Sequence, residues 1–389
     1  MSIYQEETNV HLPPTGTEKL SEAEVLAEID ILKKELKDDV IILGHHYQQN
    51  DIIRFADIVG DSLQLAKSAA KLQKEFIIFC GVHFMAETAD MLTTENQKVI
   101  LPDLRAGCSM ADMAVKADIE RAWKFFQESL QKNNTSNSNN ANNFKEEIII
   151  PITYINCAAT LKSFVGENGG AICTSSNAKE IISWAFTKGT KLLFFPDQHL
   201  GRNTCFSMGI PLEKMVVYDP RKKNGGLTSE EINKAQVILW YGFCSVHQGF
   251  KIEHVHYWKK QDPEVQIIVH PECSFDVVQA ADLSGSTSYI INVIEKAKPG
   301  SKFAIGTEIN LVNRLKEKFP EQMIFSLSPY QCLCTTMYRI RPQWLLNSLR
   351  EIMQFKKHNS SLMVSNIITV DDATKKWSLI ALNRMLELK

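Results

Sequence analysis

The strongest constraint on the fold of this chain is that its 389 residues contain three copies of one pattern. A strand-like run that ends in a polar cluster occurs three times, at 41–47, 149–156 and 267–272. His45, Asn156 and His270 hold equivalent places in these runs and follow one another by 111 and 114 residues. A long internal period of this regularity is typical of a fold built from repeated units.

Two further landmarks recur in the same order in each copy. A hydroxyl-rich turn that opens a helix occurs at Ser62, Ser175 and Thr287. A second strand-like run follows and turns at Gly81, Pro196 and Gly306. Successive copies of these landmarks are 110 to 115 residues apart. Because strands alternate with helices throughout, we expect an α/β protein with three homologous αβα units, each a parallel sheet covered by helices.

The next strand-like run of each copy leads to a cysteine, at Cys108, Cys244 and Cys334. The chain has nine cysteines and its first residues lack a secretory signal, which indicates reduced thiols rather than a disulfide framework. Three matched thiolates are too few for a closed tetrahedral zinc site, but they suit a [4Fe–4S] cluster with one iron open to substrate. Since an open iron is a Lewis acid, the pattern predicts dehydration chemistry.

Ligands bind at the carboxyl ends of parallel strands, so three similar units around a pseudo-threefold axis would share a central cavity. Ser62, Ser175 and Thr287 open helices there, and any one of them alone is a typical N-cap. Their recurrence favours a pocket for substrates with several negative charges. Acid, base and hydrogen-bonding groups are expected from a polar set near the strand ends, comprising Tyr47, Tyr154, Asn156, His247, His270 and Glu272.

Charge and hydropathy exclude several classes of protein. The net charge of −2 and the pI near 6.6 provide no basic field for nucleic acid or an anionic membrane. The longest apolar runs, such as 76–80 and 192–196, are too short to cross a bilayer. We therefore expect a cytoplasmic protein without a nucleic-acid or membrane partner. The asparagine-rich stretch 133–143 predicts a disordered surface loop after a helix.

The repeated motifs resemble those of the quinolinate synthase family of NAD biosynthesis. The matching segments run in family order over most of the chain: GHHYQ (44–48), GDS (60–62), GVHFMAETA (81–89), AGCSMADM (106–113), YIN (154–156), TSSNA (174–178), GFCSVHQ (242–248), HPEC (270–273), GSTS (285–288), GTEINLVNRL (306–315) and CTTM (334–337). GVHFMAETA and HPEC are the specific ones, whereas GDS and YIN alone would carry little weight.

The resemblance implies three αβα domains around a central cavity with a [4Fe–4S] cluster on Cys108, Cys244 and Cys334. It implies an enzyme that condenses iminoaspartate with dihydroxyacetone phosphate to give quinolinate, phosphate and two waters. L-aspartate oxidase or aspartate dehydrogenase would supply the iminoaspartate. Cys332 is a second candidate for the third ligand, and Cys334 is preferred because CTTM has the Cys-x-x-Met spacing of the family.

The resemblance also implies an active site from residues that match family motifs. The implied catalytic residues are Tyr47, His270 and Glu272. The implied substrate-binding residues are His45, Ser62, Tyr154, Asn156, Ser175, His247 and Thr287. We expect Tyr47 to act as a general acid or base near the open iron. Glu272, with His270, is expected to move protons in the ketose-to-aldose isomerisation of the triose phosphate.

The expected organisation is a tail at 1–20 followed by three units. These are 21–107 with the C-terminal helices of 340–389 packed on it, 108–243 with the insert 133–143, and 244–339. Two other functions remain open at this point. One is another [4Fe–4S]-dependent hydro-lyase, and the other is a cluster-based redox or iron sensor that is not an enzyme. The HPEC and YIN motifs disfavour the first, and the lack of a basic recognition segment disfavours the second.

Overall fold

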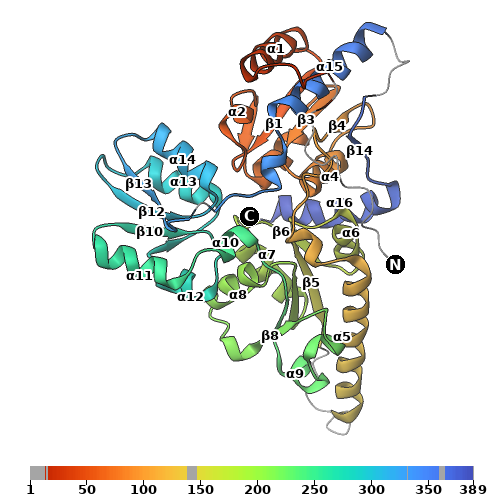
Figure 1. The fold of residues 1–389 in the computed structure, drawn as a ribbon. Helices are drawn as coiled ribbons and strands as arrows, with labels where there is room; N and C mark the ends of the chain where they lie inside the picture. Colours follow the sequence, from red (N-terminus) through yellow and green to blue (C-terminus); the bar gives the residue numbers. More distant parts are fainter. Residues whose placement is uncertain (1–13, 15, 138–146, 331, 359–363, 389) are drawn as a thin grey trace.

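The computed structural model describes residues 14, 16–137, 147–330, 332–358 and 364–388. These residues form three separate sheets, which lie at the top, at the bottom and at the left of Figure 1. All strand pairs are parallel except the one made by the short C-terminal strand. The predicted α/β class with three parallel-rich sheets is therefore confirmed.

The first sheet has the order β14-β4-β3-β1-β2. Its unit contains α1 (Glu22–Glu35), β1 (Val40–His45), α2 (Asn50–Ile53), β2 (Ile58–Gly60), α3 (Ser62–Ala69), β3 (Phe76–Cys80), α4 (His83–Leu92) and β4 (Lys98–Ile100). A capping box starts α1, because the Ser21 hydroxyl accepts the Glu24 N–H and the Glu24 carboxylate accepts the Ser21 N–H.

The second sheet has the order β6-β5-β7-β9-β8. It follows a short turn at Ala111–Met113 and α5 (Lys116–Asn137). Its unit contains β5 (Ile149–Tyr154), α6 (Ala159–Glu167), β6 (Ala171–Cys173), α7 (Ala178–Lys188), β7 (Lys191–Phe195), α8 (Gln198–Ser207), β8 (Met215–Tyr218), α9 (Ser229–Lys234) and β9 (Val237–Trp240), with short 3₁₀ turns at Leu212–Lys214 and Lys223–Gly226. Every residue of β5, β7 and β9 is buried, as expected where helices cover both faces of a parallel sheet.

The third sheet has the order β11-β10-β12-β13. Its unit contains α10 (Ser245–Gln248), α11 (Ile252–Gln261), β10 (Gln266–Val269), α12 (Phe275–Ala280), β11 (Leu283–Ser284), α13 (Thr287–Glu295), β12 (Lys302–Gly306), α14 (Ile309–Lys318) and β13 (Met323–Ser326). A 3₁₀ turn (Met337–Arg339) leads to α15 (Pro342–His358), β14 (Ile367–Ile368) and α16 (Asp372–Glu387).

Four strands of each sheet share one spatial order. Numbered along the chain, they lie across the sheet as second, first, third and fourth. β8 and β14 are additions at sheet edges. The sequence pattern missed the second strand of each unit, because β2, β6 and β11 are only two or three residues long and show no alternation. Each cysteine therefore follows the fourth shared strand, not the third as the sequence indicated.

Two expectations about the flanking segments need correction. α5 continues to Asn137, so the first part of the asparagine-rich insert is helical and not a loop, and 138–143 lies outside the described residues. α15 lies on α1, where Arg350 forms a bidentate pair with Glu28, and β14 extends the first sheet. α16 instead packs on α6 and β6 of the second unit, where Ser378 donates to the Ala159 carbonyl.

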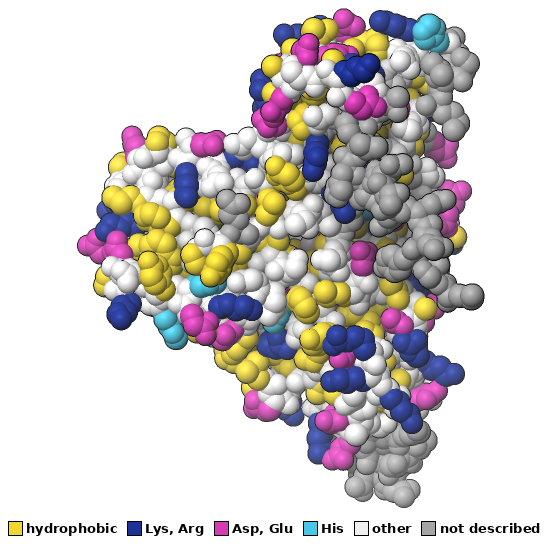
Figure 2. Space-filling view, in the orientation of Figure 1, with side chains coloured by type: hydrophobic (Ala, Val, Ile, Leu, Met, Phe, Trp, Pro, Cys, Tyr) yellow, Lys and Arg dark blue, Asp and Glu magenta, His cyan; other side chains and the backbone are white. Residues whose placement is uncertain are grey.

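One continuous apolar core joins the first two units with α15 and α16, whereas two smaller clusters cover the faces of the third sheet. Charged side chains of both signs are interspersed on the face of the molecule drawn in Figure 2. Within the described ranges, no helix combines the length and the apolar character that a membrane crossing requires.

The close contact of α6 with α16 predicts a strong effect of one methyl group. A Cβ at Gly166 would lie 2.0 Å from the Trp377 carbonyl oxygen, which belongs to the backbone and cannot move aside. Gly166→Ala should lower the free energy of unfolding by about 1–3 kcal/mol. Thr160→Ala, at an exposed position of the same helix, is the matched control. Equal thermal midpoints for the two variants would contradict this packing.

Candidate active site

A cavity in the described part of the molecule is lined by side chains from all three units. It contains all thirteen residues that the sequence singled out: His45, Tyr47, Ser62, Cys108, Tyr154, Asn156, Ser175, Cys244, His247, His270, Glu272, Thr287 and Cys334. These residues follow strand ends or open helices in their units, so the carboxyl ends of the three sheets converge here. His46 and His199 do not line the cavity.

The hydroxyls of Ser62, Ser175 and Thr287 line the cavity and do not cap the helices that begin beside them. The side-chain caps of α3 and α13 are Asp61 and Ser286, each one residue before the predicted hydroxyl. Ser62 and Thr287 are therefore not the N-caps of their helices. Ser175 lies before the start of α7, and its Oγ is 3.2 Å from Nε2 of His270. These hydroxyls can bind a ligand without breaking a helix cap.

Glu272 lies at the centre of the polar network. It is 3% exposed, and its Oε2 lies 2.7 Å from Nδ1 of His247 and 3.3 Å from Nδ1 of His270. The two imidazoles stack with ring centroids 4.5 Å apart. Burial alone would raise the pKa of the Glu272 carboxyl, but the two imidazoles outweigh burial and hold its pKa below the usual range. The site therefore contains a buried carboxylate poised between two histidines.

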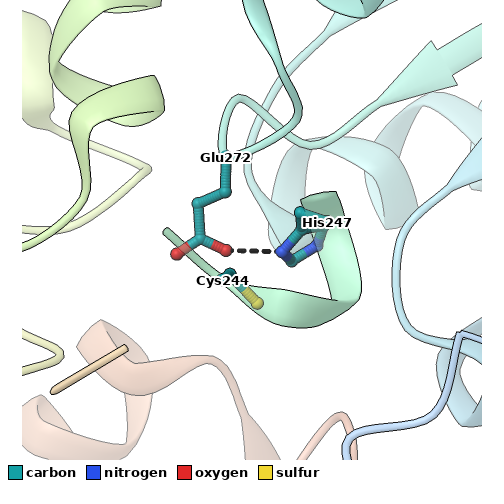
Figure 3. Close-up of side chains that lie close together, drawn as sticks. All are labelled: Cys244, His247 and Glu272. Carbon is teal, nitrogen blue, oxygen red and sulfur yellow. Dashed lines mark ion pairs between the residues drawn. The ribbon is translucent and has the colours of Figure 1, made fainter. Parts of the chain in front are cut away.

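Figure 3 shows the Glu272 carboxylate and the His247 ring pointing toward one another, with the Cys244 thiol beside them. The nearest ligand atoms of these three residues all lie within 4.8 Å of one another. Oε1 of Glu272 and Oδ1 of Asn156 are buried and have no protein partner among the described residues. Buried polar atoms without partners are costly, so they are expected to meet a ligand, an ion or water.

Two tyrosines complete the network as neutral phenols. Burial, with the charge of Glu272, raises the pKa of Tyr47 and of Tyr154 well above the usual range. The Tyr47 hydroxyl lies 3.0 Å from Oγ1 of Thr287 and 3.0 Å from Oγ1 of Thr307. Tyr47 can therefore donate a proton to a ligand in the cavity.

The three cysteines form a set of neighbouring thiols on the cavity wall. Burial raises the pKa of Cys108 to about 12, and it also raises the pKa of Cys244 and of Cys334. Cys334 adds to the rise at Cys108, and both of these thiols add to the rise at Cys244. Such thiols remain protonated unless a metal cation binds them. The donor set therefore fits a thiolate-bound metal cluster.

The backbone gives the three cysteines matching surroundings. The carbonyl of each accepts the N–H four residues later, from Asp112 at 3.1 Å, Gln248 at 2.8 Å and Tyr338 at 3.1 Å. The carbonyl two residues before each cysteine accepts the first N–H of a helix, from His83 to Ala106 at 2.8 Å, from Gln198 to Gly242 at 2.9 Å and from Ile309 to Cys332 at 3.2 Å. This register equates Cys334, not Cys332, with the other two cysteines.

Two buried acids behind the cavity, neither of which was predicted from the sequence, hold the loops of Cys244 and Cys334. Asp197 accepts the N–H of Leu200 at 2.7 Å and that of Cys244 at 3.2 Å. Glu308 accepts the N–H of Asn310 at 2.8 Å and that of Cys334 at 3.4 Å. Each acid is the N-cap of the helix that follows the repeated turn. Its place just after the aligned Pro196 or Gly306 was the sequence signal that could have identified it.

The cavity lining contains no lysine or arginine within the described part of the chain. Several apolar residues line it instead, including Val82, Phe84, Met85 and Met110. An anionic ligand would therefore meet hydroxyls, helix N-termini and imidazoles, together with any metal held by the thiols. The apolar lining limits water around such a ligand.

A family model described as quinolinate synthetase A protein matches residues 27–387. The chain belongs to the quinolinate synthetase A family. The match spans all three units, including α15 and α16, so the whole described architecture belongs to this family.

Curated relatives agree with the family assignment. A quinolinate synthase from Anoxybacillus flavithermus is 48% identical over 374 residues, which cover 96% of each chain. One from Bacillus cereus is 49% identical, over 92% of this chain and 91% of that protein. One from Rhodopirellula baltica is 48% identical, over 97% and 94%. A solved D-lactate dehydrogenase from Sporolactobacillus covers 90% of this chain and 97% of that chain at 8% identity, but its TM-score of 0.20 supports no conclusion.

The matching backbone of the three cysteines predicts different effects for two neighbouring thiols. Cys334→Ser should abolish the binding of iron and sulfide, because it removes one of three ligands in register. Cys332→Ser should retain both, since this residue supplies a carbonyl to the helix and its thiol does not line the cavity. Iron and sulfide analysis of anaerobically purified protein measures the difference, and loss in Cys332→Ser alone would reverse the assignment.

Proposed function

We propose that this chain condenses iminoaspartate with dihydroxyacetone phosphate and releases quinolinate, phosphate and two waters. The family and the curated quinolinate synthases of similar length support the reaction. The observation that carries the proposal is the meeting of three thiols with the His247–Glu272–His270 group in one cavity. Ligands for a metal cluster and groups for proton transfer are thus available to the same substrate.

Cys108, Cys244 and Cys334 would hold a [4Fe–4S] cluster. The mutual influence of their pKa values supports this ligand set, and so does the absence of a fourth cysteine from the cavity lining in the described ranges. When bound, the cluster supplies a Lewis-acidic iron that assists the loss of hydroxyl groups. Asp197 and Glu308 keep the loops of Cys244 and Cys334 in place through their backbone N–H groups.

Substrate anions would be bound by hydroxyls and amides around the cavity. Ser62, Ser175 and Thr287 lie at or near helix openings, where the backbone dipoles favour carboxylate and phosphate oxygens. The side-chain oxygen of Asn156 is buried and has no partner in the part of the chain that the structure describes, so the Asn156 amide is available to a ligand. His45 and Tyr154 complete the substrate-binding set.

Glu272 and Tyr47 would carry the proton transfers. Glu272, with His270 beside it, removes and returns protons during the isomerisation of the triose phosphate, because its carboxylate is buried and ionised. Tyr47 remains protonated in the free site and donates to a departing hydroxyl. The apolar part of the lining keeps water away from these steps.

The finer organisation is proposed on the same grounds. The shared strand order and the matching cysteine loops support three homologous αβα domains about a pseudo-threefold axis, with the bounds 21–107, 108–243 and 244–339. A cytoplasmic location stays a prediction. The supply of iminoaspartate by L-aspartate oxidase or aspartate dehydrogenase is likewise a prediction.

An anaerobic assay tests the function. Purified protein should show cluster absorbance and form quinolinate from dihydroxyacetone phosphate and freshly generated iminoaspartate. A cluster without product would favour a different hydro-lyase or a cluster-based sensor. A colourless, zinc-loaded protein prepared without oxygen would contradict the cluster.

The role of Glu272 predicts a selective loss of turnover. Glu272→Gln keeps the shape of the side chain but removes the proton acceptor, so kcat should fall by about 10²–10⁴-fold. Cluster absorbance should remain, because Glu272 is not among the three ligands. Glu213→Gln, on the exposed surface, is the control. A near-normal kcat in Glu272→Gln would refute the role.

A further inference from the structure

Thr307 holds a central place in the hydrogen-bond network without lining the cavity. It follows β12 directly and is 0% exposed. Its Oγ1 lies 3.0 Å from the Tyr47 hydroxyl and 3.2 Å from Nε2 of His247. The buried hydroxyl of Thr307 thus connects Tyr47 of the first unit with His247 of the third.

The neighbours of Thr307 define the direction of its hydrogen bonds. Nδ1 of His247 lies 2.7 Å from Oε2 of Glu272, and a carboxylate at that distance favours the proton on Nδ1. Nε2 is then the acceptor that faces Thr307. A hydroxyl donates one hydrogen bond while accepting another, so Thr307 can donate to His247 and accept from Tyr47.

Tyr47 has two hydroxyl partners with different surroundings. Thr287 lines the cavity, so it belongs to the side of Tyr47 that meets a ligand. Thr307 lies on the protein side and leads away from the ligand to His247 and Glu272. Tyr47, Thr307, His247 and Glu272 form a continuous chain of polar contacts from the cavity to a buried carboxylate.

We propose that Thr307 is a positioning residue that couples the Tyr47 phenol to the His247–Glu272 pair. Oγ1 of Thr307 contacts both the Tyr47 hydroxyl and Nε2 of His247, so it holds the phenol in place for the ligand and keeps the His247 ring beside Glu272. This inference rests on the proposed function, since it assigns Tyr47 to proton transfer.

Three variants test the coupling. Thr307→Val keeps the volume of the side chain but removes the hydroxyl, so kcat should fall at least tenfold with KM unchanged. Thr307→Ser restores the hydroxyl and should restore most of kcat. Thr17→Val removes a buried threonine hydroxyl outside the cavity and should match the parent protein. Full activity of Thr307→Val, or no rescue by serine, would overturn the proposal.

A second measurement does not depend on turnover. In protein with ¹⁵N-labelled histidine, the His247 signals, identified with a His247→Gln variant, should report a proton on Nδ1. Thr307→Val should shift the Nε2 signal, whereas Thr307→Ser and Thr17→Val should not. An unchanged Nε2 signal in Thr307→Val would refute the coupling even if the parent protein formed no quinolinate. Lack of quinolinate from the parent protein would refute the proposed function instead.

Discussion

The hydrogen bond from the start of a helix to the carbonyl two residues before each cysteine is the contact on which the site depends. It occurs once in each unit, at Ala106, Gly242 and Cys332, and it fixes the loop that carries the cysteine two residues later. The helix follows a buried strand of the sheet, so its first turn is fixed by the core, and the hydrogen bond ties the loop to that turn. Three separate stretches of the chain can thus bring three thiols to one cavity without any covalent link between them.

The second constraint is the cost of burying Glu272. An isolated carboxylate is strongly disfavoured in a buried site, and partners with good geometry are needed to offset that cost. His247 and His270 both lie close to Oε2, while Oε1 has no partner among the described residues. The side chain is therefore held firmly by one oxygen, and the other is left for chemistry. Thr307 extends the same network to Tyr47, which belongs to a different unit.

Much of the site could be predicted from the sequence because the repeat separates three cysteines from the six others. His45, Asn156 and His270 were found for the same reason, since they follow equivalent strands. Asp197, Glu308 and Thr307 were missed because they act behind the cavity through contacts that exist only after folding. The position of α16 on the second unit was also beyond the sequence, since Gly166 marks a close helix contact without naming the partner helix. The shortest strands lacked enough residues to show a pattern.

Mössbauer spectroscopy of ⁵⁷Fe-labelled protein, purified without oxygen, tests the three-cysteine site most directly. Four irons per chain are expected, and one of them, which lacks a thiolate, should change its spectrum when malate, a stable hydroxydicarboxylate, is added. Four irons that stay equivalent with and without malate would contradict a site with three cysteines and one open position. A single iron or a two-iron spectrum would contradict the cluster itself.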